Sequence, residues 1–201
     1  YVYREIQRLR EKYPDKPIHA VITDMGASGG YYMASAVENI YVNPSSIVGS
    51  IGVIMNGFGF TDALEKLGVE RRLFTAGESK GMLDPFSPLV EEEVAHIRQL
   101  LDAIHAQFIE AVKAGRGDRL ADAPEIFSGK FWDGEASIEL GLADEIGDLN
   151  YVAREVIGTS KVVDYTDKPD LLERFSEQVG IALGHALASQ IGAEEGRVSL
   201  R

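Results

Sequence analysis

The sequence predicts an α/β fold in which parallel strands alternate with crossover helices. Residues 18–25, IHAVITDM, form an almost continuous apolar run, which is typical of a strand buried on both faces of a parallel sheet. Residues 94–108 instead place apolar side chains at spacings of three and four, which predicts an amphipathic helix. Segments of the two kinds alternate along the chain, so the connections between parallel strands are expected to be right-handed crossovers.

The first part of the chain is expected to hold short elements around one glycine-rich turn. Ile6, Leu9 and Tyr13 share one stripe, so the chain opens in a helix that the breaker YPDKP ends. The elements expected next are a strand at 18–25, a turn at 26–30 and a short helix at 31–38. A second strand follows at 40–44, and then a loop feeding a β-branched strand at 46–55.

The second part is dominated by one long helix, expected over about 89–114, with Glu91, Glu92 and Glu93 in its first turn, where the helix dipole favours anions. Before it, Thr61 as N-cap and Gly68 as stop bound a shorter helix. The other expected elements are a strand at 69–75, a loop at 76–88, helices near 134–140 and at 149–158, a strand at 161–166 and a C-terminal amphipathic helix at 167–191.

Composition excludes several classes of protein. The 201 residues are 45% hydrophobic and 26% charged, as in globular proteins, and the formal net charge of −12 argues against nucleic acid as a partner. The absence of cysteine excludes disulfides, a cysteine nucleophile and thiolate metal sites. The uncharged stretch 39–61 contains a proline and four glycines, so no membrane-spanning helix is expected there. A helix already under way at Tyr1 indicates a piece of a longer protein.

Ser28 is the first candidate for chemistry. It lies in GASGG, residues 26–30, which matches the pattern G-x-S-x-G between an expected strand and an expected helix. Small neighbours let a substrate backbone approach the hydroxyl, and the N–H of Gly29 is free to donate to an oxyanion. A tight strand-to-helix turn requires the same small residues, so the motif alone leaves a purely structural role open.

A nucleophilic serine needs a base, and the sequence offers histidines and a lysine. The histidines are His19, His96, His105 and His185. Asp144 and His185 follow Ser28 in the order of an α/β-hydrolase triad, but His185 is expected within a helix. Lysine acts as a base where burial lowers its pKa. Lys80, in the loop 76–88, is the lysine candidate, although a solvated loop lysine has the same local sequence.

Four separated blocks of the sequence resemble the bacterial signal peptide peptidase A family, which are serine proteases with a Ser-Lys dyad on the Clp-protease/crotonase-like fold. In chain order the blocks are 27–54, 64–70, 76–88 and 128–147, and the similarity runs from about residue 18 to about residue 158. Ser28 and Lys80 stand 52 positions apart, which is similar to the family's nucleophile-to-base spacing. The resemblance implies this fold, with its N-terminal part missing from the chain.

The resemblance implies roles for four residues. Ser28 matches the nucleophile, Lys80 the general base, and the backbone N–H of Gly29 one donor of the oxyanion hole. Ser50 matches the serine that hydrogen-bonds the lysine amine and orients it. The family's second oxyanion donor comes from a glycine-rich turn after an earlier strand, which is expected to precede Tyr1. The resemblance implies no cofactor and no metal.

By the same resemblance, the protein is expected to be a serine endopeptidase that hydrolyses hydrophobic peptides such as cleaved signal-peptide remnants. It is expected to form a homo-oligomer of the tetramer or octamer class, without nucleic acid. A segment absent from this chain would attach it to the bacterial cytoplasmic membrane, with the catalytic domain on the periplasmic side and this fragment soluble. Residues 1–158 are assigned to the peptidase domain, and 159–201 to a C-terminal strand and amphipathic helix with a flexible tail.

Two other functions stay open. The first is a catalytically silent, membrane-associated assembly protein of the same fold, against which the presence of Ser28, Lys80 and Ser50 argues. The second is an acyl-CoA enzyme on the crotonase-like fold. A nucleophilic serine facing a lysine has no evident use in that chemistry.

Overall fold

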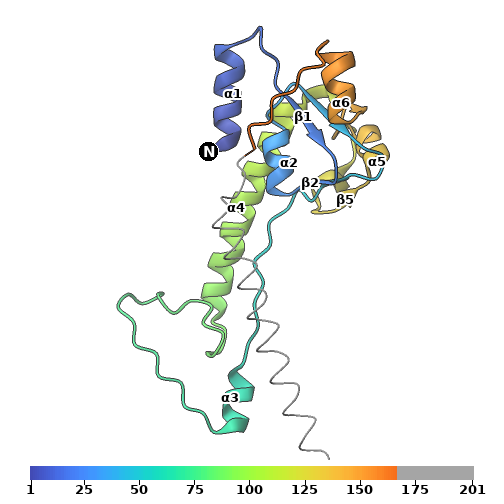
Figure 1. The fold of residues 1–201 in the computed structure, drawn as a ribbon. Coiled ribbons are helices and arrows are strands. Elements are labelled where there is room, and N and C mark those ends of the chain that lie inside the picture. The colour runs from blue at the N-terminus through green and yellow to red at the C-terminus, as the bar shows by residue number, and fades with distance from the viewer. Residues whose placement is uncertain (167–201) are drawn as a thin grey trace, which may run out of the picture. The chain divides into compact units, whose positions relative to one another are not determined.

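The computed structural model describes residues 1–166 of the chain. The chain divides into two compact units, Tyr1–Ser160 and Lys161–Arg201. In the first unit, helix α2 (Gly29–Ala34) packs against both α1 (Val2–Lys12) and α4 (Glu91–Arg116), on one side of the strands (Figure 1). The C-terminal helix expected at 167–191 lies outside the described residues.

The strands form two small sheets. In the first, β1 (His19–Ile22), β3 (Asn39–Val42) and β6 (Glu145–Ile146) pair in parallel. In the second, β4 (Ile47–Gly49) pairs in parallel with β2 (Met25–Ala27) and antiparallel with β5 (Phe131–Trp132). Because α2 lies in the crossover from β1 to β3, the prediction of an α/β fold with parallel strands and crossover helices is confirmed. The single strand expected at 18–25 is instead divided between the two sheets.

Several helix boundaries follow the sequence signals and one does not. Helix α3 (Thr61–Leu67) ends at Gly68, whose φ of 66° is left-handed, as its role of helix stop requires. Thr61 was expected to be the N-cap, and this is wrong, since Phe60 holds that position without a side-chain capping bond. The Phe60 N–H donates to the Pro85 carbonyl at 2.7 Å and its ring stacks on Phe86, which fixes where the helix begins.

Helix α4 forms over nearly the expected length, and its C-terminal half packs into the core. Of the apolar face expected over 94–108 only Phe108 is buried, whereas Ile104 is exposed; Ala111 and Val112, one turn further on, are buried beside Phe108. A Cβ at Gly115 would lie 1.8 Å from the carbonyl oxygen of Ser35, so only glycine allows α4 to approach α2 this closely. Helix α4 therefore packs closely against the C-terminal end of α2.

Two of the expected strands do not form. Residues 69–75 and 161–166 adopt neither helix nor strand, and within 46–55 only Ile47–Gly49 is a strand. A strand needs a partner for its backbone groups. Among residues 1–166 neither 69–75 nor 161–166 pairs with a strand of the two sheets. The β-branched residues of these segments favour a strand, but composition does not show whether a neighbouring strand is present to pair with them.

Beyond the 3₁₀ turn at the end of α4, three further helical pieces follow among the described residues. They are η2 (Pro124–Phe127), a 3₁₀ turn; α5 (Gly134–Glu139), close to the expected 134–140; and α6 (Leu149–Tyr151), which continues as a π-helical turn over Val152–Val156. A 3₁₀ turn at Gly117–Arg119 closes the end of α4. No described helix is long and apolar enough to cross a membrane.

The two tyrosines after Ser28 anchor α2 in the core. Tyr31 is fully buried, and its hydroxyl donates to the Leu142 carbonyl at 2.8 Å. Burial also raises the pKa of Tyr31, so its hydroxyl stays a donor. The Tyr32 ring stacks on Phe108 of α4, with ring centres 4.7 Å apart. Both contacts are packing contacts, and together they hold the N-terminus of α2 in place.

A buried ion pair joins α4 to the chain before β6. Arg116 is 1% exposed, and its guanidinium makes two 2.8 Å hydrogen bonds to the Asp144 carboxylate. Asp144 also accepts from the Ile40 N–H at 2.7 Å, and Arg119 approaches its other oxygen at 3.2 Å. Burial alone would raise the pKa of Asp144, but the hydrogen bonds from Arg116 and Ile40 outweigh it and hold this pKa below its ordinary value.

Replacing Asp133 by alanine is expected to lower the free energy of unfolding by about 1 kcal/mol. The Asp133 carboxylate caps α5 by accepting from the Ala136 N–H at 2.8 Å, and alanine leaves that N–H unsatisfied. Urea denaturation of the full-length protein measures the change. Asp133→Asn keeps an acceptor in place and serves as the control, with an expected loss of only a few tenths of a kcal/mol. Equal losses in both variants would contradict a capping role.

Candidate active site

Ser28 occupies the turn between β2 and α2, as the sequence predicts. Its φ of 52° and ψ of −121° lie in a region that non-glycine residues rarely adopt. The residue is exposed and its hydroxyl makes no capping bond to α2. A serine held in a strained strand-to-helix turn with a free hydroxyl has the backbone context of a nucleophile.

The parallel register of β2 and β4 places Ser50 beside Ser28. Ala27 pairs with Gly49, so the next residues of the two strands stand at the same sheet end. The Ser28 N–H donates to the Gly49 carbonyl at 2.8 Å, and the Ser50 N–H donates to the Lys130 carbonyl at 2.7 Å. Ser50 also has a φ of 52°. Ser28 and Ser50 thus each follow the last residue of a strand and lie in a turn that a backbone hydrogen bond stabilises.

Gly29 is the first residue of α2 and is open to its surroundings. A Cβ at Gly29 or Gly30 would meet no atom within 4 Å. A groove of about 900 Å³ adjoins Gly29, and Tyr32 and Met33 of α2 line it together with side chains of α1 and α4. The N–H groups of a first helical turn have no partner within the helix. Among residues 1–166 the Gly29 N–H makes no backbone hydrogen bond outside its helix.

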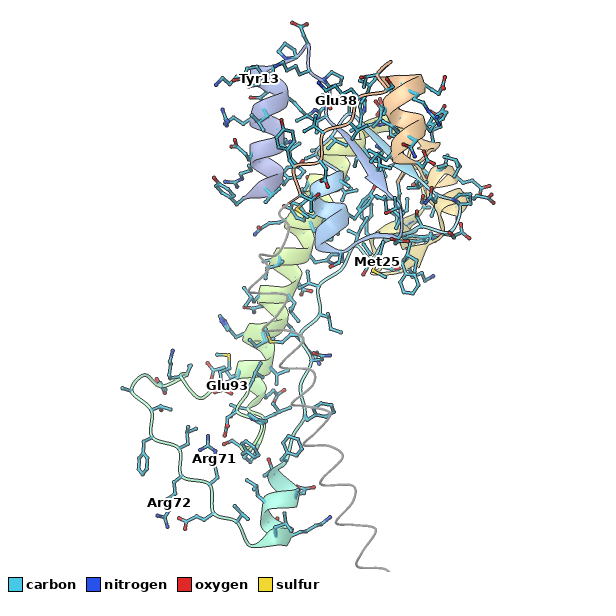
Figure 2. The ribbon with its side chains drawn as sticks, in the orientation of Figure 1. Tyr13, Met25, Glu38, Arg71, Arg72 and Glu93 are labelled. Atoms are coloured by element: carbon cyan, nitrogen blue, oxygen red, sulfur yellow. The ribbon has the colours of Figure 1, made fainter. Side chains whose placement is uncertain are left out.

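Lys80 is not brought to the two serines. It lies in the linking segment, residues 52–90, which connects β4 to α4 and includes α3. Figure 2 shows Arg71 and Arg72 of this segment on the side of Glu93, in the first turn of α4, and well away from Met25 at the start of β2. Lys80 is exposed, and among residues 1–166 no hydrogen bond or ion pair joins it to Ser28 or Ser50. The role predicted for Lys80 stays a prediction.

The linking segment carries large apolar side chains that are exposed in the described part of the chain. The most exposed are Phe74 at 90%, Ile54 at 83% and Phe58 at 81%. Its internal contacts include the ion pair of Arg71 with Asp84 at 3.2 Å and the stacking of Phe60 on Phe86. A cavity of about 410 Å³ separates residues 55–59 from the apolar side chains of α4.

The histidine alternatives find no support among the described residues. Asp144, the acid of the alternative triad, is engaged by Arg116, and His185 lies outside the described part of the chain. The His19 ring packs edge-on against Tyr41, with ring centres 5.7 Å apart. His105 contacts the carbonyl oxygen of Ile51 at 3.0 Å instead of a serine hydroxyl. Within residues 1–166 no three His, Asp or Glu side chains cluster as metal ligands.

Comparison with known families identifies the family to which this chain belongs. The model of "Peptidase family S49" matches residues 10–162, which include Ser28, Ser50 and Lys80. The chain belongs to peptidase family S49. Its expected resemblance to the signal peptide peptidase A proteins is confirmed, because a putative signal peptide peptidase SppA from Enterococcus faecium is 30% identical over 95% of this chain and 55% of its own length.

Other relatives of this S49 chain carry different names. A protein named Na(+)/H(+) antiporter NhaA, from Brucella abortus, is 41% identical over 97% of this chain and 26% of its own length. A probable protease SohB from Buchnera aphidicola is 29% identical over 91% of this chain and 54% of its own length. The chain thus spans about a quarter to about half of the length of these curated relatives.

A solved enoyl-CoA hydratase from Thermoplasma volcanium aligns with 98% of this S49 chain and 59% of its own, at a TM-score of 0.35 and 18% identity. A similarity of this size supports no argument about the site.

Proposed function

We propose that this S49 chain is part of a serine endopeptidase in which Ser28 attacks the peptide carbonyl and Lys80 is the general base. The backbone of Ser28 carries this proposal, because a strained, exposed serine between a parallel strand and a helix is the arrangement of a nucleophile. Membership of a peptidase family agrees with it.

In the proposed reaction, neutral Lys80 takes the proton of the Ser28 hydroxyl as its oxygen bonds to the carbonyl carbon. The carbonyl oxygen becomes an oxyanion, which accepts from the Gly29 N–H. Lys80 then returns the proton to the leaving amine, and an acyl-enzyme remains on Ser28. Water, deprotonated by Lys80, hydrolyses that ester and restores both residues.

Ser50 fits the role of orienting the lysine. A neutral amine has one lone pair for the Ser28 proton and two N–H groups that need acceptors. Ser50 follows Gly49 of β4 and Ser28 follows Ala27 of β2, so the two serines stand at the same end of the paired strands. A hydroxyl there both satisfies the amine and aims it.

We further propose that Lys80 reaches Ser28 through a second copy of the chain. Two observations support this arrangement. Among residues 1–166 no hydrogen bond joins a base to Ser28, and within the same residues the linking segment that holds Lys80 leaves Ile54, Phe58 and Phe74 exposed. Docking this segment on the Ser28 region of a neighbour buries that apolar surface and completes the dyad. Such a head-to-tail contact closes into a ring, in keeping with a tetramer or octamer.

The proposed substrates are hydrophobic peptides, including remnants of cleaved signal peptides, and the proposed location is the membrane. The name of the Enterococcus faecium relative and the apolar groove beside Gly29 support this. We propose no transport function from the antiporter-named relatives, because their similarity covers 26% of their length and the matching family model is that of a peptidase.

A fluorophosphonate probe tests the nucleophile directly. In the full-length protein the probe is expected to label Ser28 covalently, since the activated hydroxyl displaces fluoride from phosphorus. Mass spectrometry of the digested protein locates the adduct. Ser28→Ala should abolish labelling, whereas Ser45→Ala, at an exposed serine of the loop between β3 and β4, should not. A wild-type protein that stays unlabelled would point to the catalytically silent alternative.

A further inference from the structure

His105 of α4 braces the turn that contains Ser50. Its Nε2 lies 3.0 Å from the carbonyl oxygen of Ile51, the residue after Ser50. A carbonyl oxygen only accepts, so Nε2 carries the hydrogen and donates it. Ile51 is fully buried, and His105 is half-buried on the face of α4 that meets the sheets. The bond thus links the long helix to the end of β4 across 54 positions of sequence.

The turn at Ser50 depends on such side support. Ser50 is held at a φ of 52°, and the Gly52 N–H donates back to the Ser50 carbonyl at 2.9 Å, which closes a three-residue γ-turn around Ile51. β4 ends at Gly49, and after the bond from the Ser50 N–H to the Lys130 carbonyl at 2.7 Å residues 51–60 form neither helix nor strand. The Ile51 carbonyl at the centre of this turn has His105 as its donor among the described residues.

We propose that His105 is a positioning residue for catalysis, which acts through Ile51 to fix the turn at Ser50, at the sheet end that also holds Ser28. This inference rests on the proposed dyad. If the brace is lost, the γ-turn is free to rotate the Ile51 peptide, and the Ser50 hydroxyl moves with it. The lysine amine is then no longer oriented toward Ser28. The protein stays folded, because other core contacts stabilise it. The expected signature is a fall in kcat with little change in KM.

A matched pair of variants isolates the hydrogen bond. In His105→Gln the amide nitrogen takes the place of Nε2 and still reaches the Ile51 carbonyl. In His105→Asn the amide ends one atom short, at the place of Nδ1, and cannot reach it. We expect kcat of the asparagine variant to fall about tenfold to a hundredfold and KM to change less than about threefold. The glutamine variant should stay within about threefold of the wild type in both.

The rate at which a fluorophosphonate labels Ser28 gives the second measurement. This rate reports the nucleophile and its base without a peptide, and it should fall with kcat in His105→Asn but not in His105→Gln. His105→Ala, with and without added imidazole, repeats the comparison should the asparagine variant fail to assemble; imidazole is expected to restore labelling. His96→Asn, an exposed histidine of the same helix, is the control and should leave kcat unchanged.

Full kcat and full labelling rate in folded His105→Asn would overturn the inference and leave the dyad standing. So would equal losses in the glutamine and asparagine variants, because the hydrogen bond would then not be the cause. A wild-type protein that neither cleaves peptides nor takes the probe would remove both the inference and the proposed function.

Discussion

Replacing Lys80 by alanine in the full-length protein is expected to lower kcat for peptide hydrolysis by at least about a thousandfold. Without a base, the Ser28 hydroxyl keeps its proton and is a weak nucleophile. The Lys80 side chain makes no hydrogen bond or ion pair to Ser28 or Ser50 among residues 1–166, so its loss should leave the unfolding temperature of the isolated chain unchanged. Steady-state kinetics with an apolar fluorogenic peptide measures the effect.

Lys66→Ala is the matched control for this prediction. It removes the same charge from the same linking segment, in the last turn of α3, and should keep kcat within about threefold of the wild type. Size-exclusion chromatography of both variants shows whether assembly is intact. Full activity of assembled Lys80→Ala would eliminate the dyad, and equal losses in the two variants would indicate that the charge of the segment matters rather than the base.

Replacing Asp144 by alanine is expected to lower the free energy of unfolding by about 3 kcal/mol. The change leaves the guanidinium of Arg116, which is 1% exposed, without its counter-ion, and it leaves the Ile40 N–H without an acceptor. The lower end of the range for a broken buried pair applies because the Asp144 side chain is 16% exposed. Urea denaturation at neutral pH measures the loss. A loss under about 1 kcal/mol, the size expected of a surface pair, would contradict this account.

The contribution of Asp144 should also depend on pH. Because its pKa is held below the ordinary value in the folded protein, its stabilising effect is fully present above the unfolded pKa of about 3.9. The effect is lost as pH falls through the lower folded pKa. The difference in unfolding free energy between wild type and Asp144→Asn should therefore be constant near neutrality and shrink below about pH 4. A difference that grows on acidification would contradict the direction of this shift.

The part of the site around Ser28 could be predicted because its signals are local. Small residues at a strand-to-helix junction fix the turn, and parallel pairing of two short strands places Ser50 beside Ser28. The position of Lys80 could not be predicted in this way. Residues 69–75 have the composition of a strand, but a strand forms only where another edge accepts its backbone groups, and that depends on what covers the linking segment.

Charged residues of the core show the same limit. Asp144 has the chain order of a triad acid, yet its carboxylate is turned to Arg116, which lies 28 positions earlier on α4. No periodicity in the sequence indicates that these two side chains meet. From the sequence, His105 is likewise a candidate base. The structure shows that it donates instead to the backbone carbonyl of Ile51, just after β4. Contacts between distant segments, rather than local patterns, assign these roles.

Co-expression of Ser28→Ala and Lys80→Ala chains tests the central claim, that two copies of the chain share each active site. If Lys80 of one copy serves Ser28 of the next, random mixing regenerates intact dyads at about a quarter of the sites, although each variant alone is inactive. Peptide hydrolysis by the purified mixed oligomer should then recover to about a quarter of wild-type activity. A mixed oligomer that is as inactive as the separate variants would show that the two residues act within one chain.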